Sequence, residues 1–152
     1  MQRLEELLPH KAPMILLSGY EEPVGEDSVS SFVDIAEDSP FFEREIDGVP
    51  GCVALEYMAQ TTALFAGITR RRLGLGPAMG FVLGSRRLET RIPAFRRGSR
   101  YGITAKCTYQ DEELGSFDCE IRDGDGNVVA QGTLKVFLPG DVAATGDMEE
   151  FP

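Results

Sequence analysis

A single glutamate inside an apolar segment is the first residue of this sequence that could do chemistry. Glu56 lies in a stretch rich in Ala, Leu, Met and Gln, where an unpaired carboxylate is costly to bury. Gln60 follows at i+4, so on a helix the two side chains share one face and the amide can orient the carboxylate. We therefore expect Glu56 either to donate or accept a proton, or to be held structurally by a partner such as Gln60 or a tyrosine.

The histidine and cysteine content excludes several other chemistries. His10 is the one histidine, which excludes zinc sites built on two or three histidines. The sequence also lacks the Gly-x-Ser-x-Gly motif that carries the nucleophile of many Ser-His-Asp triads. Cys52, Cys107 and Cys119 are odd in number and lack Cys-x-x-Cys spacing, so we expect free thiols and no metal site. Cys107 and Cys119 fall on the apolar side of strand patterns, which predicts that both are core thiols.

Charge is distributed unevenly along the chain. Nine arginines and one acid give residues 70–100 a net charge of +8, whereas the rest of the chain carries six bases and 24 acids, a net charge of −18. An arginine-rich segment on an acidic chain indicates a site for a phosphate or an acidic partner. The alternative is that these arginines form weak surface pairs with the surplus carboxylates. The overall net charge of −10 argues against a nucleic-acid-binding protein.

One long helix must position Glu56 and Gln60. It is predicted from residue 51 to about residue 72, because this segment follows a proline and ends in three arginines with glycines after them. Most of its circumference is apolar, so other structure should enclose it. A second, short helix is predicted over residues 2–8, before the first prolines.

Alternating apolar and polar residues predict the strands around this helix. They cover residues 14–17, 28–36, 81–83, 100–109, 116–122 and 128–138, and the last three should form an antiparallel meander. The fold class is therefore α+β, with an antiparallel sheet of five or six strands wrapped around one long central helix. Residues 1–140 are expected to form this single domain, and residues 141–152 an acidic, frayed tail.

The sequence contains no segment typical of a membrane protein. Residues 52–68 form the longest apolar stretch, but one carboxylate and three polar residues interrupt it. Met1 is followed by a polar segment rather than by the basic and apolar regions of a signal peptide. We expect a cytoplasmic protein with no membrane association.

Two segments carry distinctive motifs. Residues 8–17 read Leu-Pro-His-Lys-Ala-Pro-Met-Ile-Leu-Leu, and residues 50–60 read Pro-Gly-Cys-Val-Ala-Leu-Glu-Tyr-Met-Ala-Gln. The first resembles the amino-terminal signature of the hot-dog-fold β-hydroxyacyl-(acyl carrier protein) dehydratases of the FabA/FabZ type, and the second resembles the start of their central helix. Residues 80–98 and 136–139 are similar to one branch, the dehydratase-like proteins of aryl polyene biosynthetic clusters. The resemblance covers roughly residues 7–139.

The resemblance implies a hot-dog fold that works as a homodimer with active sites at the subunit interface. The implied substrate is an acyl thioester on a phosphopantetheine arm, on an acyl carrier protein or coenzyme A, and no cofactor is needed. Glu56 falls on the family's catalytic acid, and Gly51 on the glycine whose N–H polarises the thioester carbonyl, as free amides at a helix N-terminus can. Substrate contacts are expected from Gly51, Cys52, Gln60, Arg86 and Arg87, with the arginines receiving the phosphate or the acidic carrier.

The catalytic histidine of the family is missing from its usual segment. Family members carry Gly-His-Phe-Pro-Gly before the helix, whereas residues 41–48 read Phe-Phe-Glu-Arg-Glu-Ile-Asp-Gly. Glu45 takes the place of the histidine, but an ordinary glutamate has a pKa about two units below that of an imidazole and would need burial to serve as the base. His10 is the other candidate base. It is alternatively structural, because the family has a histidine there even when the catalytic histidine is present.

The sequence leaves three functions open. The first is dehydration of 3-hydroxyacyl thioesters in fatty-acid or polyene-type biosynthesis, with Glu56 as acid or base. The second is thioester hydrolysis, in which one helix carboxylate activates water and no α-proton is removed. The third is a catalytically silent subunit that pairs with a histidine-bearing paralogue and contributes Glu56 across the interface.

Overall fold

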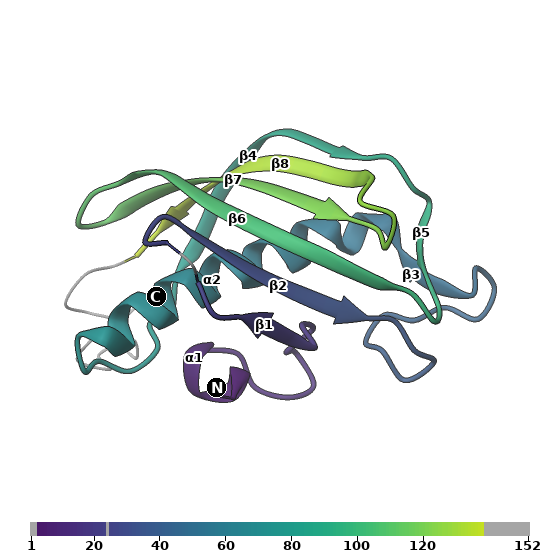
Figure 1. The fold of residues 1–152 in the computed structure, drawn as a ribbon, viewed down its shortest axis with the longest axis horizontal. Helices are drawn as coiled ribbons and strands as arrows, with labels where there is room; N and C mark the ends of the chain where they lie inside the picture. Colours follow the sequence, from purple (N-terminus) through teal and green to yellow (C-terminus); the bar gives the residue numbers. More distant parts are fainter. Residues whose placement is uncertain (1–2, 24, 139–152) are drawn as a thin grey trace, which may run out of the picture.

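A long helix lies beneath a curved antiparallel sheet in the computed structural model, which describes residues 3–23 and 25–138 (Figure 1). The sheet has six strands in the order β1-β2-β6-β7-β8-β4. Their bounds are Gly19–Glu21 for β1, Ser28–Asp34 for β2, Phe81–Thr90 for β4, Arg100–Gln110 for β6, Leu114–Arg122 for β7 and Val128–Phe137 for β8. This is the predicted α+β hot-dog arrangement, and the expected tail at 141–152 lies outside the described residues.

The central helix, α2, spans Ala54–Arg72 and follows a single 3-10 turn at Gly51–Val53. Three arginines occupy its last turn, where their positive charges stabilise the helix by interacting with the negative end of its dipole. Its buried side includes Tyr57, whose ring packs edge-on against Phe95 with 5.2 Å between ring centroids. Burial raises the pKa of Tyr57 well above its ordinary value. The predicted helix is confirmed, including its enclosure by other structure.

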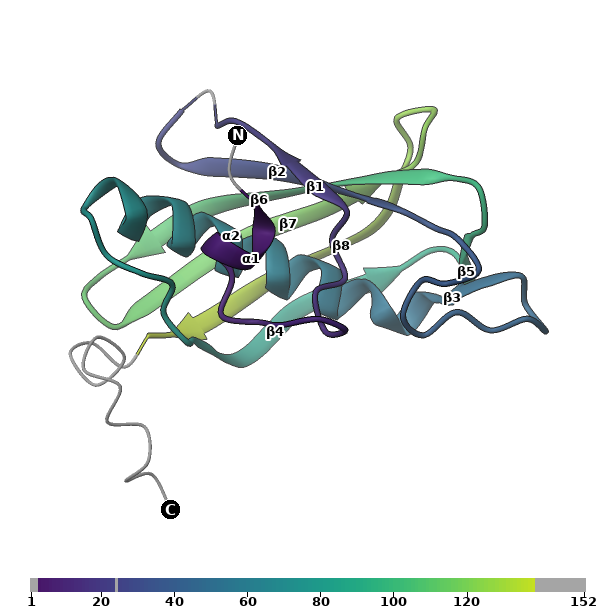
Figure 2. The same ribbon diagram turned by 90° about the horizontal axis from the view of Figure 1, so that it is seen from below.

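A small second sheet stands beside the start of α2. It consists of β3, Gly48–Pro50, and β5, Ala94–Arg96, which pair antiparallel. The chain runs from β3 directly into the 3-10 turn, so this pairing sets where the helix begins. Figure 2 shows the pair at the end of α2 opposite its arginines.

The strands β6, β7 and β8 form the predicted meander. Ile103, Ile121 and Leu134, one from each strand, are fully buried in the core formed with α2. Burial of such a side chain stabilises the fold by roughly 1.5–3 kcal/mol. Cys119 lies in the same core, where burial raises the pKa of its thiol to about 11, so the prediction of a core thiol is confirmed there.

A β-bulge changes which way the last residues of β6 face. The register between β6 and β7 shifts between Cys107 and Tyr109. Tyr109 is 57% exposed and its hydroxyl donates to Asp111 at 2.9 Å, while Cys107 is only half-buried. The alternation predicted over residues 100–109 therefore ends before Tyr109, because one extra residue reverses the two-residue period. The prediction of a core thiol at Cys107 is only partly right.

Residues 14–17 do not form the predicted strand. Their backbone is held by a side chain of α2 instead, since Leu16 N–H donates to Gln60 Oε1 at 2.9 Å and Gln60 Nε2 donates to Met14 C=O at 2.7 Å. Regular sheet pairing begins only at Gly19, opposite Phe32. A short apolar run cannot reveal that its hydrogen-bond partner is a helix side chain far along the chain.

The outer strand β4 is longer than predicted. It spans Phe81–Thr90 rather than residues 81–83, and every one of its residues is exposed. Its pairing with β8 shifts register between Val82 and Gly84 and again between Arg86 and Glu89. Because neither side of this edge strand is buried, its sequence lacks the alternation by which strands are identified.

The short helix α1, Leu4–Leu7, packs closely against α2. A Cβ atom added to Gly67 would lie 2.0 Å from the backbone oxygen of Leu7. Leu7 and Leu8 are each buried against this part of α2. Gly67 therefore serves to bring the two helices together, although glycine is a poor residue for a helix interior.

Replacing Gly67 with Ala tests this contact. Alanine would favour an isolated helix by about 1 kcal/mol. We nevertheless expect the free energy of unfolding to fall by about 1–3 kcal/mol, because the backbone of α1 must move to admit the methyl group. Urea denaturation measures the change, with Gly102→Ala as the control because nothing lies within 4 Å of a Cβ there. A more stable Gly67→Ala protein would contradict this account of the packing.

Candidate active site

Gln60 is fully buried and holds Glu56 to the segment that precedes β1. Its Nε2 donates to Glu56 Oε1 at 3.1 Å and to Met14 C=O at 2.7 Å, while its Oε1 accepts from Leu16 N–H at 2.9 Å. The expected contact between Gln60 and Glu56 is therefore present. The same amide also fixes the residues that follow His10 in the chain.

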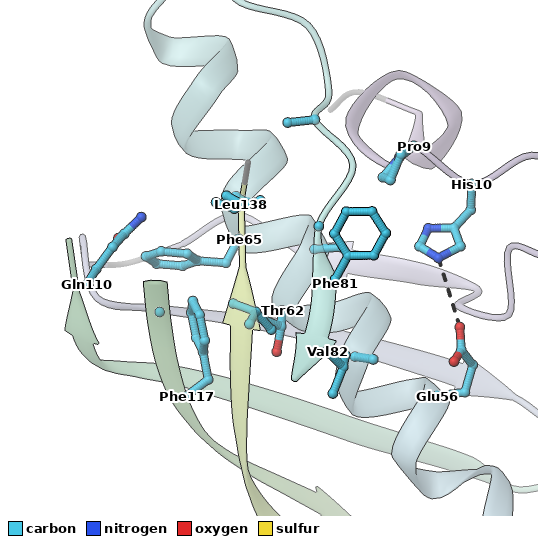
Figure 3. A pocket seen from close by; sticks show the side chains of 17 residues that line it. Pro9, His10, Glu56, Thr62, Phe65, Phe81, Val82, Gln110, Phe117 and Leu138 are labelled. Carbon is cyan, nitrogen blue, oxygen red and sulfur yellow. Dashed lines mark ion pairs between the residues drawn. The ribbon is translucent and has the colours of Figure 1, made fainter. Parts of the chain in front are cut away.

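His10 lies beside Glu56 in the structure. The distance from His10 Nε2 to Glu56 Oε1 is 3.9 Å, and the two side chains are 29% and 42% exposed. Figure 3 shows the imidazole pointing toward the carboxylate. The other ring nitrogen, Nδ1, is buried and has no hydrogen-bond partner among the described residues. Of the two residues considered in place of the family's histidine, His10 is the one that the structure brings to Glu56.

A cavity of about 210 Å³ opens beside this pair. Its walls come from α2, β4, β7 and β8, and Figure 3 shows Phe65 and Phe117 on the far side from Glu56, with Phe81 beside His10. The larger apolar side chains that line it are Phe65, Phe81, Val82, Phe117, Val136 and Leu138. Apolar walls with a few polar groups at one end are typical of a binding site for an apolar ligand. Phe65 belongs to the buried core and also lines this cavity.

The spacing of three alanines in the sequence is a signal for this cavity. Ala59, Ala63 and Ala66 line the cavity and follow Glu56 at intervals of three, four and three residues. That spacing places all four residues on one side of a helix. Small side chains on the side that carries the carboxylate leave room for a ligand, whereas larger residues would fill it.

Gly51 and Cys52 do not line the cavity within this chain. The N–H of Gly51 donates to Pro93 C=O at 2.9 Å, so the expected oxyanion donor is already used. A Cβ atom at Gly51 would lie 2.4 Å from Ile92 C=O, which explains why glycine stands there. Cys52 is exposed and its thiol is free.

Glu45 lies away from the cavity. It is exposed in the turn between Glu43 and Gly48, whose backbones pair with each other. The burial that a carboxylate base would require is absent in the single chain. The expectation that Glu45 takes the place of the family's histidine therefore finds no support in this geometry.

The arginines of residues 70–100 divide into paired and unpaired groups. Arg97 binds Asp47 at 2.7 Å and Arg100 binds Asp34 at 2.7 Å, which holds the pKa of Asp34 below its ordinary value. Arg91 pairs with Glu89 at 3.5 Å. For these arginines, the alternative of surface ion pairs is confirmed.

Arg86 and Arg87 are exposed on β4 and neither lines the cavity. Arg87 adopts a positive φ of 53° at the bulge of that strand and borders a separate surface cleft with Asp118 and Glu120. Within the described residues, neither arginine forms a salt bridge. The structure does not bring them to Glu56.

In residues 3–23 and 25–138, no group of three or more His, Cys, Asp or Glu side chains could hold a metal ion. Over the same residues, no helix is long and apolar enough to cross a membrane.

Replacing Gln60 with Leu tests the hydrogen bonds at the centre of the site. The change introduces an apolar side chain of similar size and leaves the buried Leu16 N–H without an acceptor. We expect the free energy of unfolding to fall by about 1–3 kcal/mol. Gln131→Leu is the control, because its amide bonds Glu89 at the surface and its loss should change stability by less than about 0.5 kcal/mol. Equal losses in the two variants in urea denaturation would contradict the role of Gln60.

Comparison with known proteins places this chain in a family. The family model for ApeP-like proteins, described as ApeP dehydratase, matches residues 2–147. The structure is similar to a chain of the dehydratase heterocomplex ApeI:P from Xenorhabdus doucetiae, with a TM-score of 0.86, 30% identity and 99% of each chain covered.

Two curated relatives are 3-hydroxyacyl-(acyl-carrier-protein) dehydratases named FabZ. The protein from Polynucleobacter necessarius is 30% identical over 137 residues, which cover 88% of this chain and 89% of that protein. The protein from Roseobacter denitrificans is 31% identical over 72 residues, which span 45% of this chain and 47% of that protein. With the match to the family model over most of the sequence, these findings show that the chain belongs to the ApeP-like family of dehydratases.

Proposed function

We propose that this chain acts in the dehydration of 3-hydroxyacyl thioesters carried on an acyl carrier protein, with Glu56 as the acid. The observation that carries the proposal is the carboxylate of Glu56, oriented by Gln60 at one end of an apolar cavity of about 210 Å³. The carboxylate can reach a polar group of a substrate whose apolar chain fills the cavity. Membership of a dehydratase family supports the same reaction.

Dehydration needs a base as well as an acid. The base removes a proton from the α-carbon, the electron pair forms the double bond to the β-carbon, and the bond from the β-carbon to the hydroxyl breaks. Protonated Glu56 gives its proton to the departing hydroxyl, which leaves as water. Each group must lie within hydrogen-bond reach of its own substrate atom, so the base must be a second group, distinct from Glu56.

We assign the base to a histidine of a second hot-dog chain. The sequence holds one histidine, and His10 already faces Glu56 from the same side of the cavity. The similar structure from Xenorhabdus doucetiae is a chain of a heterocomplex, which supports a heteromeric partner. His10 then helps to orient Glu56, in the segment that Gln60 holds. This proposal adopts the third alternative from the sequence and gives Glu56 a catalytic role.

The partner chain is proposed to pair with β4. This strand ends the sheet, so its outer N–H and C=O groups have no strand beside them among the described residues. Several large apolar side chains are exposed along it, namely Phe81, Val82, Leu83 and Leu88. Phe81 and Val82 also line the cavity, so a chain bound at this edge would lie beside the site.

Arg71 and Arg72 are proposed to contact the acidic carrier protein. Both are exposed at the end of α2, and neither forms a salt bridge within the described residues. The chain from Ala78 to Val82, which follows this end of α2, lines the cavity. A carrier bound to these arginines would therefore lie near the segment that borders the substrate site.

The reaction is tested by incubating a 3-hydroxyacyl carrier protein with this chain, alone and together with a histidine-bearing hot-dog chain from the same organism. We expect enoyl product only from the mixture. Glu56→Gln should lower its rate about a hundredfold to ten-thousandfold, the usual contribution of a positioned acid. Gln131→Leu serves as the matched surface variant and should leave the rate unchanged.

Other outcomes would contradict parts of the proposal. Release of free thiol without enoyl product would show a thioesterase. Full activity of Glu56→Gln would show that Glu56 is not the acid. Activity of the chain alone that is lost in His10→Gln would make His10 the base and remove the need for a partner histidine.

The β4 interface is tested by Leu83→Lys. The side chain of Leu83 is 61% exposed in the single chain, so lysine should leave folding of the chain unchanged. A charge buried between two paired edges is unfavourable, so we expect association with the partner to weaken at least tenfold. Analytical ultracentrifugation measures the association, with Leu75→Lys as the control because Leu75 is exposed outside the sheet. Equal association of both variants would place the interface elsewhere.

A further inference from the structure

The cavity extends well beyond the pair of Glu56 and His10. In Figure 3 these two residues lie on one side, and Phe65, Phe117 and Gln110 lie on the other, with Val82 between them. Glu56 and Ala66, which both line the cavity, are ten residues apart on α2, a distance of about 15 Å along the helix. The cavity therefore has the shape needed for a linear apolar chain.

Gly115 lies at the far end of this cavity. It is buried in β7, opposite Gln110 of β6 and Val136 of β8. A Cβ atom added there would lie 3.0 Å from the ring of Phe117 and 3.3 Å from a methyl group of Val136. Gly115, Phe117 and Val136 all line the cavity. A side chain at position 115 would therefore take up space at that end.

The backbone conformation does not require glycine at this position. Gly115 is not among the residues with a positive φ, and it lies within a regular stretch of the pairing between β7 and β8. Glycine weakens a strand interior, and in such a place it marks a bulge or a close approach by a ligand or another chain. The bulge of β6 lies opposite Ser116 and Phe117 rather than opposite Gly115. The cavity beside Gly115 supplies the space for such a ligand.

We propose that Gly115 determines the length of acyl chain that this protein accepts. The inference rests on the proposed function and extends it to the far end of the substrate. The thioester end of a long 3-hydroxyacyl chain lies at Glu56, its methylene groups pass over Ala59, Ala63 and Ala66, and its last carbons reach Gly115 and Phe117. Each methylene group moved from water to such walls strengthens binding by about fourfold. The favoured substrates are accordingly long, unbranched 3-hydroxyacyl thioesters.

The test compares two thioesters in the complete heteromeric enzyme. For 3-hydroxydodecanoyl and 3-hydroxybutanoyl carrier protein, kcat/KM is measured with the unchanged chain and with Gly115→Val. We expect the ratio of the long to the short substrate to fall at least tenfold, while the short substrate is turned over as before. Gly102→Val is the control, because an added Cβ there meets nothing within 4 Å and Gly102 lies outside the cavity. Its ratio should remain unchanged.

The other possible results separate a failure of the assignment of Gly115 from a failure of the proposed function. An unchanged ratio in Gly115→Val, or an equal fall for both substrates in a folded variant, would overturn the assignment of Gly115. If Gly115→Val does not fold, Gly115→Ala is used, and it should lower the ratio by at least threefold. If the unchanged enzyme dehydrates neither substrate, the proposed function fails. Calorimetric binding of dodecanoyl-pantetheine then tests Gly115 by itself, with at least tenfold weaker binding expected in Gly115→Val and equal binding contradicting the inference.

Discussion

The hydrogen bonds of one buried amide join the parts of this molecule that make its site. Gln60 lies in α2 with its side chain fully buried, and both polar atoms of its amide form hydrogen bonds. Two of those partners are backbone groups of residues 14 and 16, and the third is the carboxylate of Glu56. A buried amide without such partners would be strongly destabilising. The segment that carries His10 and the helix that carries Glu56 are therefore fixed together, and the cavity begins where they meet.

The rest of the fold positions a site that is open on one side. The meander of β6, β7 and β8 covers α2 and supplies the far wall of the cavity, while β4 supplies a wall with its own outer edge unpaired among the described residues. Gln60 holds Glu56, the proposed acid, but the histidine of the family has no equivalent in the segment before the helix. A second chain beside β4 would complete the sheet edge and the chemistry together. In the proposed function, a base supplied by the partner chain would explain how a domain with a single histidine belongs to a dehydratase family.

Much of the architecture was predictable because local patterns reflect burial. The apolar helix and the strict alternation from Tyr101 to Ala105 identified the core elements, since side chains there are buried on one side. Predictions failed where the determinants were not local. Residues 14–17 are held by a helix side chain rather than by a strand, and a bulge reverses the facing of Tyr109. At the site, Glu56 and its contact with Gln60 were predictable from their i+4 spacing. The proximity of His10 depends on a tertiary contact that no spacing encodes.

Hydrogen exchange of the Leu16 amide tests the central claim most directly. This N–H lies outside every helix and strand, and Gln60 Oε1 is its acceptor. If Gln60 holds the segment as described, the Leu16 amide should exchange as slowly as that of Ile103 in the core of the sheet, because both would open only when the domain unfolds. Exchange as fast as that of the exposed turn at Gly124 would contradict the claim, since the segment would then open without disturbing the helix.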